Sequence, residues 1–230
     1  MQTPKNSWRG FTLIELLVVI AIIAIFASMI QVPRPRDKAK AKRISCTNNL
    51  KQVGFGFRLW ANDHEGKFPM ELLLTNGGAM ETLLTGDLVT VFEVMSNELN
   101  TPKILYCPAN ENRSQATSFG RSPIIKDGYP SIPFASNSNV TYFVGIDVKT
   151  NTPQAFLIGD DNLQTGSSPA KSGRLSLTTA DDVSWIKTRH EKPVVGNIGM
   201  ADGSVQGFSS LALKAALKTT GLPTNRLAMP

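Results

Sequence analysis

The sequence has few of the residues that build metal and catalytic centres. Its 230 residues include only two cysteines and two histidines, and the cysteines do not form a Cys-x-x-Cys pair. Zinc is usually held by four Cys or His ligands, so the small number and wide spacing of these residues argue against a zinc site. The sequence also lacks a nucleophile-elbow serine motif, a P-loop and a dinucleotide-binding fingerprint. No enzyme class is therefore indicated by a specific motif.

Outside a single segment, basic and acidic residues nearly balance, so the chain has little net charge there. The formal net charge is +6, but residues 34–43 alone carry six basic residues against Asp37. The high isoelectric point is thus a local feature and does not predict a nucleic-acid-binding surface, although DNA binding stays open as a minority interpretation. Near a membrane, this segment would lie over anionic lipid headgroups. The six residues are Arg34, Arg36, Lys38, Lys40, Lys42 and Arg43.

One long apolar run is present, from Phe11 to Val32, and only Thr12, Glu15, Ser28 and Gln31 interrupt it. As a helix, this run would be about 33 Å long, enough to cross a bilayer. The run follows Gly10, whereas an ordinary secretory signal places its small residues after the apolar region. A charged group deep in a membrane helix costs about 2.5–3.5 kcal/mol, so Glu15 indicates a function. The alternative is a plain signal anchor that tolerates this residue near the membrane surface.

Residues 9–20, Arg-Gly-Phe-Thr-Leu-Ile-Glu-Leu-Leu-Val-Val-Ile, resemble the prepilin-type cleavage and methylation signal of type IV pilins and type II secretion pseudopilins. The resemblance covers about the first 32 residues. It implies that a prepilin peptidase cuts between Gly10 and Phe11 and methylates the new amino group of Phe11. It also implies that Glu15 is the acidic residue needed for assembly.

The charge on Glu15 fits this implied processing. Cleavage would give Phe11 an ammonium group, and methylation would leave that group charged. In a site of low dielectric constant an unpaired ion is costly and a paired ion much less so. Glu15 of one subunit is therefore expected to pair with the Phe11 ammonium of a neighbouring subunit.

The rest of the chain predicts an α+β fold, in which a long N-terminal helix packs on a C-terminal antiparallel sheet, as in type IV pilins. Pro33 and Pro35 predict a kink just after the membrane helix. The expected parts are a leader at 1–10, a transmembrane helix at 11–32, an amphipathic helix at 33–61 and a periplasmic globular domain at 62–230.

Within these parts, apolar residues at helical spacing run from Ile44 to Trp60, and residues 79–99 form a further helix broken at Gly86. Residues 108–139 are expected to be loop, and 210–219 a short final helix. Asp202-Gly203 predicts a type I′ hairpin turn between two strands. The predicted strands are 140–148, 154–159, 183–188, 194–200 and 204–209.

Shorter motifs extend the resemblance to pseudopilin-like families of Planctomycetes and Verrucomicrobia-type bacteria. They are Ser45–Gly54, Asp63–Pro69 and Leu105–Pro108, together with His190 before Asp202-Gly203. Eleven residues separate His190 from Asp202 here, two more than is usual in these families, so the resemblance does not establish a contact between the two side chains.

Cys46 and Cys107 are expected to form a disulfide in an oxidising compartment. The alternatives are two buried free thiols or a metal pair.

One set of residues, a histidine and three aspartates, allows the protein to be interpreted as an enzyme. His190, Asp160, Asp161 and Asp202 would form a divalent-metal or acid/base site. The favoured interpretation makes Asp202 a turn residue and His190 a hydrogen-bonding residue at a strand end. The same three aspartates are candidate oxygen ligands for calcium.

The sequence thus predicts a structural subunit and not an enzyme. The expected assembly is a type II secretion pseudopilus, anchored once in a bacterial inner membrane with its C-terminal domain in the periplasm. Its expected partners are the prepilin peptidase, further pilin-like subunits, inner-membrane assembly proteins and membrane lipid. The alternatives are a type IV pilus or competence pilin, a membrane-anchored metal-dependent enzyme, and an anchored binding protein. The basic residues of 34–43 would favour the opposite orientation by the positive-inside rule.

Overall fold

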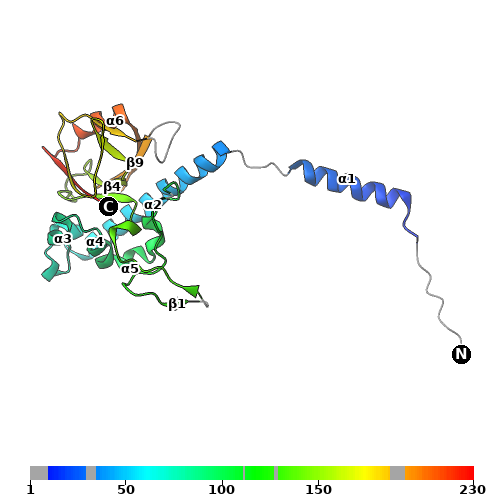
Figure 1. Cartoon of the computed structure of the whole chain (residues 1–230), viewed down its shortest axis with the longest axis horizontal. Helices are drawn as coiled ribbons and strands as arrows, with labels where there is room; N and C mark the ends of the chain where they lie inside the picture. Colours follow the sequence, from blue (N-terminus) through cyan, green and yellow to red (C-terminus); the bar gives the residue numbers. More distant parts are fainter. Residues whose placement is uncertain (1–9, 30–34, 111, 127–128, 187–194) are drawn as a thin grey trace. The chain divides into compact units, whose positions relative to one another are not determined.

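The computed structural model describes residues 10–29, 35–110, 112–126, 129–186 and 195–230. The chain divides into two compact units, residues 1–38 and residues 39–230. The first described helix is α1 (Leu13–Met29) and the second is α2 (Pro35–Asp63) (Figure 1). The kink expected at Pro33 lies outside the described residues.

Helix α2 supplies one wall of the core of the globular unit. The apolar residues predicted at helical spacing from Leu50 to Trp60 are buried, and Cys46 is buried with them. Ile44 was expected on the same face, but this residue is about half exposed. The buried face therefore begins at Cys46, two residues later than the sequence pattern predicts. A Cβ atom on Gly56 would lie 2.8 Å from Leu99 Cδ2, so glycine allows α5 to approach closely here.

The segment after α2 consists of short helices. The helix expected over residues 79–99 is divided into three, and the expected break at Gly86 is present with φ of +89°. The helical elements between α2 and the sheet are η1 (Pro69–Glu71), η2 (Leu74–Asn76), α3 (Met80–Leu84), α4 (Val89–Val94), α5 (Ser96–Leu99) and η3 (Pro102–Leu105).

Residues 108–139 are mostly irregular, as expected, with a small antiparallel hairpin formed by β1 (Ile125–Lys126) and β2 (Tyr129–Pro130) and a 3-10 turn η4 (Asn137–Asn139).

The central element is a six-stranded antiparallel sheet of order β10-β9-β4-β3-β11-β7. This sheet and α2 confirm the α+β pilin-like architecture. The strands are β3 (Tyr142–Gly145), β4 (Phe156–Asp160), β7 (Gly173–Leu177), β9 (Val195–Met200), β10 (Val205–Ser209) and β11 (Asn225–Met229). A second sheet has the order β6-β5-β8, with β5 (Leu163–Thr165), β6 (Ser168–Pro169) and β8 (Val183–Trp185).

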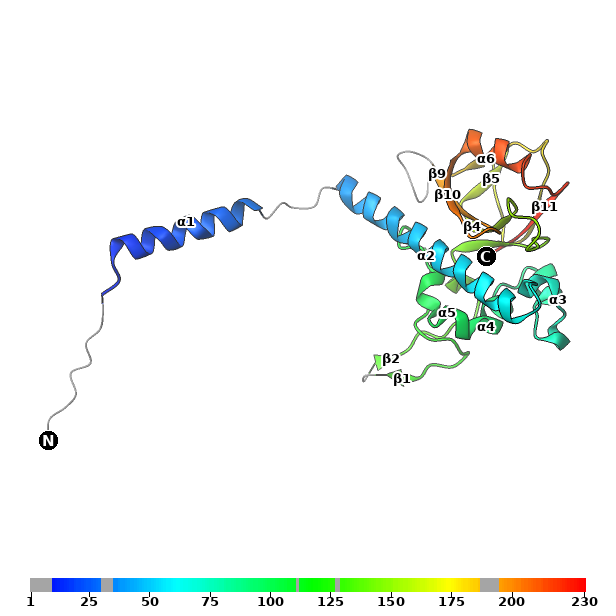
Figure 2. The ribbon, with the colours of Figure 1, turned by 180° about the vertical axis from the view of Figure 1, so that it is seen from behind.

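Both faces of the central sheet are covered. One face packs against α2 and α3–α5, and the other against α6 (Ser210–Leu217) and the small sheet (Figures 1 and 2). Strands β3, β4 and β9 are consequently buried along their whole length, which explains why their residues are mostly apolar.

The hairpin predicted at Asp202-Gly203 joins β9 to β10. Its predicted type I′ geometry is wrong, because that turn needs positive φ at both central residues and only Gly203 has it, at +87°. Four residues form the loop, and Gly203 N–H donates to the Met200 carbonyl at 2.9 Å.

Candidate functional site

The N-terminal segment is fully accessible at the predicted cleavage junction. Gly10 and Thr12 are exposed, and Phe11 is 72% exposed. The helix begins only at Leu13, so the Gly10–Phe11 bond lies outside regular secondary structure. A peptidase needs such an unfolded and exposed bond. A Cβ atom on Gly10 would meet nothing within 4 Å in the structure. No intramolecular packing therefore requires glycine at this position.

Glu15 closes the start of α1 by a reciprocal hydrogen-bond pattern with Thr12. The Thr12 backbone N–H and hydroxyl both donate to Glu15 Oε2, at 2.9 and 2.7 Å, and Glu15 N–H donates to Thr12 Oγ1 at 3.3 Å. This is a capping box, in which Thr12 is the N-cap and Glu15 is the third helical residue. Among the described residues only Thr12 donates to this carboxylate, and both bonds reach the same oxygen.

The surface of α1 is apolar on every side. Its described side chains are all exposed, and only Glu15 and Ser28 among them are polar. The Ser28 hydroxyl is satisfied within the helix, since it donates to the Ile25 carbonyl at 2.7 Å. A helix that is hydrophobic all round is normally covered by lipid or by other helices.

A transmembrane helix was expected at 11–32, but residues 30–32 of that range lie outside the described residues. Within the described part of the chain, none of the helices combines the length and the apolar character needed to cross a membrane.

Cys46 and Cys107 are joined by a disulfide in the structure. The bond connects the first buried turn of α2 to the segment after η3, and both residues are completely buried. Cys107 N–H also donates to Thr141 Oγ1 at 2.7 Å, next to β3. The bond therefore ties the helix, across a separation of 61 residues, to a segment that is hydrogen-bonded to the chain entering β3.

The candidate acidic residues have separate structural roles. Asp160 is buried on β4, where its Oδ2 accepts from Asn197 N and Nδ2 at 2.8 and 2.9 Å. Asp161 forms an ion pair with Arg113. Asp202 is a turn residue, as favoured, and accepts from Ser204 N–H at 2.8 Å.

In the described ranges no group of three or more His, Cys, Asp or Glu residues could hold a metal ion. His190 lies outside those ranges, so neither its predicted role at a strand end nor a contact with Asp202 is described.

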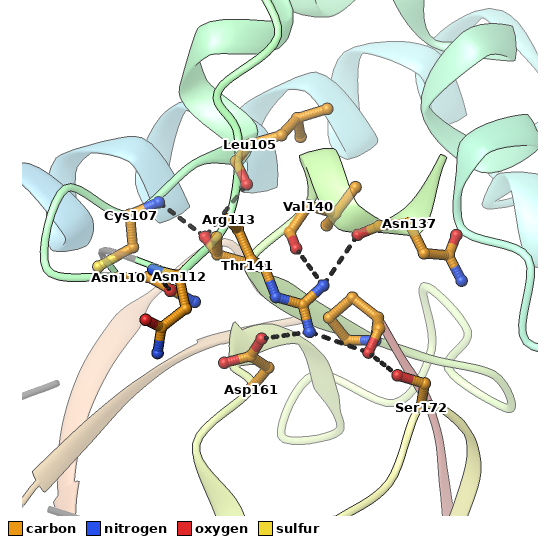
Figure 3. A network of polar contacts seen from close by, with 11 residues as sticks. Leu105, Cys107, Asn110, Asn112, Arg113, Asn137, Val140, Thr141, Asp161 and Ser172 are labelled. Atoms are coloured by element: carbon orange, nitrogen blue, oxygen red, sulfur yellow. Dashed lines mark hydrogen bonds and ion pairs between the residues drawn. The ribbon is translucent and has the colours of Figure 1, made fainter. Parts of the chain in front are cut away.

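Arg113 is the centre of a polar network that the sequence did not predict (Figure 3). Its Nη1 donates to the carbonyl oxygens of Asn137 and Val140, at 3.0 and 3.1 Å. Its Nη2 donates to the carbonyl oxygen of Pro230 at 3.0 Å and lies 3.3 Å from Asp161 Oδ2. One guanidinium thus connects η4, the start of β3, the end of β4 and the residue after β11.

Strand β11 is consequently held at both ends. Beyond its end, Pro230 accepts from Arg113 and from the Ser172 hydroxyl, the latter at 2.6 Å. Near its start, Arg226 forms a two-bond ion pair with Asp147. These bonds raise the pKa of the Arg226 guanidinium above its usual value. The arrangement fixes β11 between β3 and β7.

We expect Arg113→Ala to lower the free energy of unfolding by about 3 kcal/mol, because several partly buried acceptors would lose their donor together. Chemical denaturation followed by circular dichroism measures this change. Arg121→Ala is the matched control, since Arg121 pairs with Glu93 at 3.0 Å and its side chain is 72% exposed. An Arg113→Ala variant as stable as the Arg121→Ala control would contradict the importance of the network.

Comparison with known proteins identifies the N-terminal segment. Residues 9–30 match the family model of the prokaryotic N-terminal methylation motif. The match confirms the prepilin-type cleavage and methylation signal, and it supports a pilin-like or pseudopilin-like structural subunit. It ends before the motifs that suggested the Planctomycetes-type subclass. No curated protein and no solved structure gave a significant match to the chain.

Proposed function

We propose that this chain is a structural subunit of a type II secretion pseudopilus. In this proposal a prepilin peptidase cleaves the precursor after Gly10 and methylates Phe11. The mature chain then assembles through α1 with further copies and with related subunits at the inner membrane. The globular unit lies in the periplasm, and the chain has no catalytic role.

One observation carries the proposal, namely the methylation motif directly joined to an exposed helix that is apolar all round. A soluble enzyme would have no use for such a surface, because exposed apolar side chains of this number promote association. In a filament, copies of α1 would cover one another and the lipid would cover the rest. The exposed cleavage junction supports the same reading.

The capping box supports a role for Glu15 before and after cleavage. In the structure, Glu15 Oε2 accepts hydrogen bonds from the Thr12 backbone N–H and hydroxyl, whereas none of the described residues donates to Oε1. That second oxygen is free to accept from the ammonium group of a neighbouring Phe11. The same carboxylate can therefore start the helix within one subunit and join it to the next.

The disulfide supports a location outside the cytoplasm, where such bonds form and persist. The basic residues at the start of α2 oppose this orientation by the positive-inside rule. Lys38 and Lys40 are exposed on that helix and would contact anionic headgroups. We give the cleavage signal more weight, because its peptidase acts on a cytoplasmic leader.

Mass spectrometry of the N-terminus tests the proposal. We expect the purified mature chain to begin at Phe11 with a methylated amino group, and Gly10→Ala to remain at its full precursor length. Gly54→Ala is the control, since Gly54 lies in α2 with open space around its Cβ position. A Gly10→Ala chain that is still cut before Phe11 would exclude the prepilin peptidase.

The type of filament is tested by deleting the gene in its own host. Loss of protein secretion with intact surface pili would support the pseudopilus. Loss of surface pili or of DNA uptake with normal secretion would instead support the type IV pilus or competence alternative.

A further inference from the structure

A hollow of about 800 Å³ lies between the α5–η3 segment and the chain that carries the β1–β2 hairpin. Figure 2 shows this hairpin projecting from the globular unit on the same side as α5. The volume falls within the usual range of small-molecule binding sites. The hollow is separate from the cleavage junction, from the disulfide and from the Arg113 network.

Hydrogen bonds hold the walls of the hollow in place. They join the two chain segments that flank the β1–β2 hairpin, which together form the hairpin arm. Ser118 Oγ donates to Ser131 Oγ at 3.0 Å, and the same Ser131 oxygen accepts from Ile124 N–H at 2.9 Å. Thr117 N–H donates to the Ile132 carbonyl at 2.8 Å. The two segments of the arm are therefore also joined outside β1 and β2. The hollow is thus formed before any ligand binds.

The lining combines uncharged polar groups with an aromatic ring. The residues that the argument uses are Ser96, Asn97, Asn100, Lys103, Ser118 and Tyr129. Amides and hydroxyls of this kind both donate and accept hydrogen bonds. Among the described lining residues, Lys103 alone is charged. The site thus offers many neutral hydrogen-bonding groups and little charge.

Asn97 and Asn100 have side-chain amides that form no hydrogen bond with any described residue. Asn100 also has a φ of +61°, in a tight turn where Thr101 N–H donates to the Leu99 carbonyl at 2.7 Å. A non-glycine residue in this conformation costs on the order of 1 kcal/mol, and such strain is frequent at binding sites. Here it accompanies two amides that remain available for a ligand.

Tyr129 adds a flat apolar surface to the lining of the same hollow. The residue is 78% exposed on β2, although a tyrosine ring normally buries much of its area. An exposed ring next to neutral donors and acceptors matches a sugar, which has an apolar C–H face and a rim of hydroxyls. A purely apolar ligand would leave the amides unpaired. An anionic ligand would find one cationic partner, Lys103, among the described lining residues.

We propose that this hollow is a binding site for a neutral oligosaccharide. One sugar ring stacks on Tyr129, and neighbouring hydroxyls bond to the amides of Asn97 and Asn100 and to the hydroxyls of Ser96 and Ser118. The proposal is independent of the filament, because it concerns only the globular unit and requires no second copy.

The test is isothermal titration of the full chain, purified in a detergent without a sugar headgroup, with maltohexaose, cellohexaose and chitohexaose. We expect at least one of these neutral probes to bind. Tyr129→Ala and Asn97→Leu should each raise the Kd about tenfold or more. Ile125→Ala is the matched control, since Ile125 is 83% exposed on the same hairpin but does not line the hollow, and its Kd should not change.

The proposal is overturned if none of the three probes binds, or if binding survives both Tyr129→Ala and Asn97→Leu. It is also overturned if dextran sulfate binds through Lys103 while the neutral probes do not. Thermal melts of Tyr129→Ala and Ile125→Ala should agree with the parent protein, because both side chains are exposed. The N-terminal residue found by mass spectrometry has no bearing on any of these outcomes.

Discussion

Removal of the Cys46–Cys107 bond is expected to lower the melting temperature of the globular unit by about 10 °C. A cross-link that closes a loop of this length stabilises the native state by about 4 kcal/mol on the chain-entropy model. For a domain of this size, each kcal/mol corresponds to roughly 2–4 °C. The bond joins α2 to the segment beside β3, so its loss frees the helix that forms one wall of the core.

Circular dichroism melts with and without a reductant measure this effect. The Cys46→Ala/Cys107→Ala double variant should melt near the reduced parent protein and should not respond to the reductant. A reductant that lowers the melting temperature of the double variant equally would show that its effect is unrelated to the disulfide. An unchanged melt of the fully reduced parent protein would contradict the predicted stabilisation.

Loss of the charge at Glu15 is expected to abolish filament assembly while insertion and cleavage continue. An ammonium group left without its partner in a site of low dielectric constant costs about 3–5 kcal/mol, and a filament repeats that cost at every subunit. Glu15→Ala would also remove the capping box, which is worth about 1 kcal/mol to the helix. The two contributions need separate variants.

Glu15→Gln and Thr12→Val separate charge from capping. Glutamine can keep the cap but not the charge, whereas Thr12→Val removes the hydroxyl bonds and keeps the carboxylate. We expect Glu15→Gln to fail in assembly and Thr12→Val to assemble with a modest loss. Immunoblots of sheared filaments measure assembly. N-terminal sequencing of the protein in the membrane fraction measures insertion and cleavage. Normal filaments from Glu15→Gln would refute the proposed ion pair.

The sequence predicted those features that depend on local patterns. Helical spacing identified the buried face of α2 from Leu50 to Trp60, and the Gly86 break was correct because this residue needs a positive φ. Ile44 was misplaced, since spacing alone cannot say where along a helix its packing partner begins. The hairpin at Asp202 was found, but not its loop length, which depends on where pairing of β9 and β10 stops.

The elements that the sequence did not predict depend on distant contacts. Strand β11 lies after Gly221 and Pro223, where the pattern suggested only the end of a helix, and its place between β3 and β7 is fixed by pairing with both. Strand β7 is half exposed at an edge and lacks an apolar run. Arg113 stands in a polar loop, and nothing nearby in the sequence indicates its four partners. The capping box was missed as well, although it is local and Thr12-Leu13-Ile14-Glu15 carries its sequence signature.

The order of strands in the central sheet affects how this protein can be made. Strand β11 is the last strand in the sequence, yet among the described strands of that sheet it alone pairs with β7. The domain therefore cannot close until Met229 has left the ribosome, although domains generally start to fold from their N-terminal side during synthesis. In the proposed export to the periplasm, the central sheet would stay incomplete until β11 has crossed the membrane. Late completion of the sheet would then oppose folding of the globular unit before that proposed export.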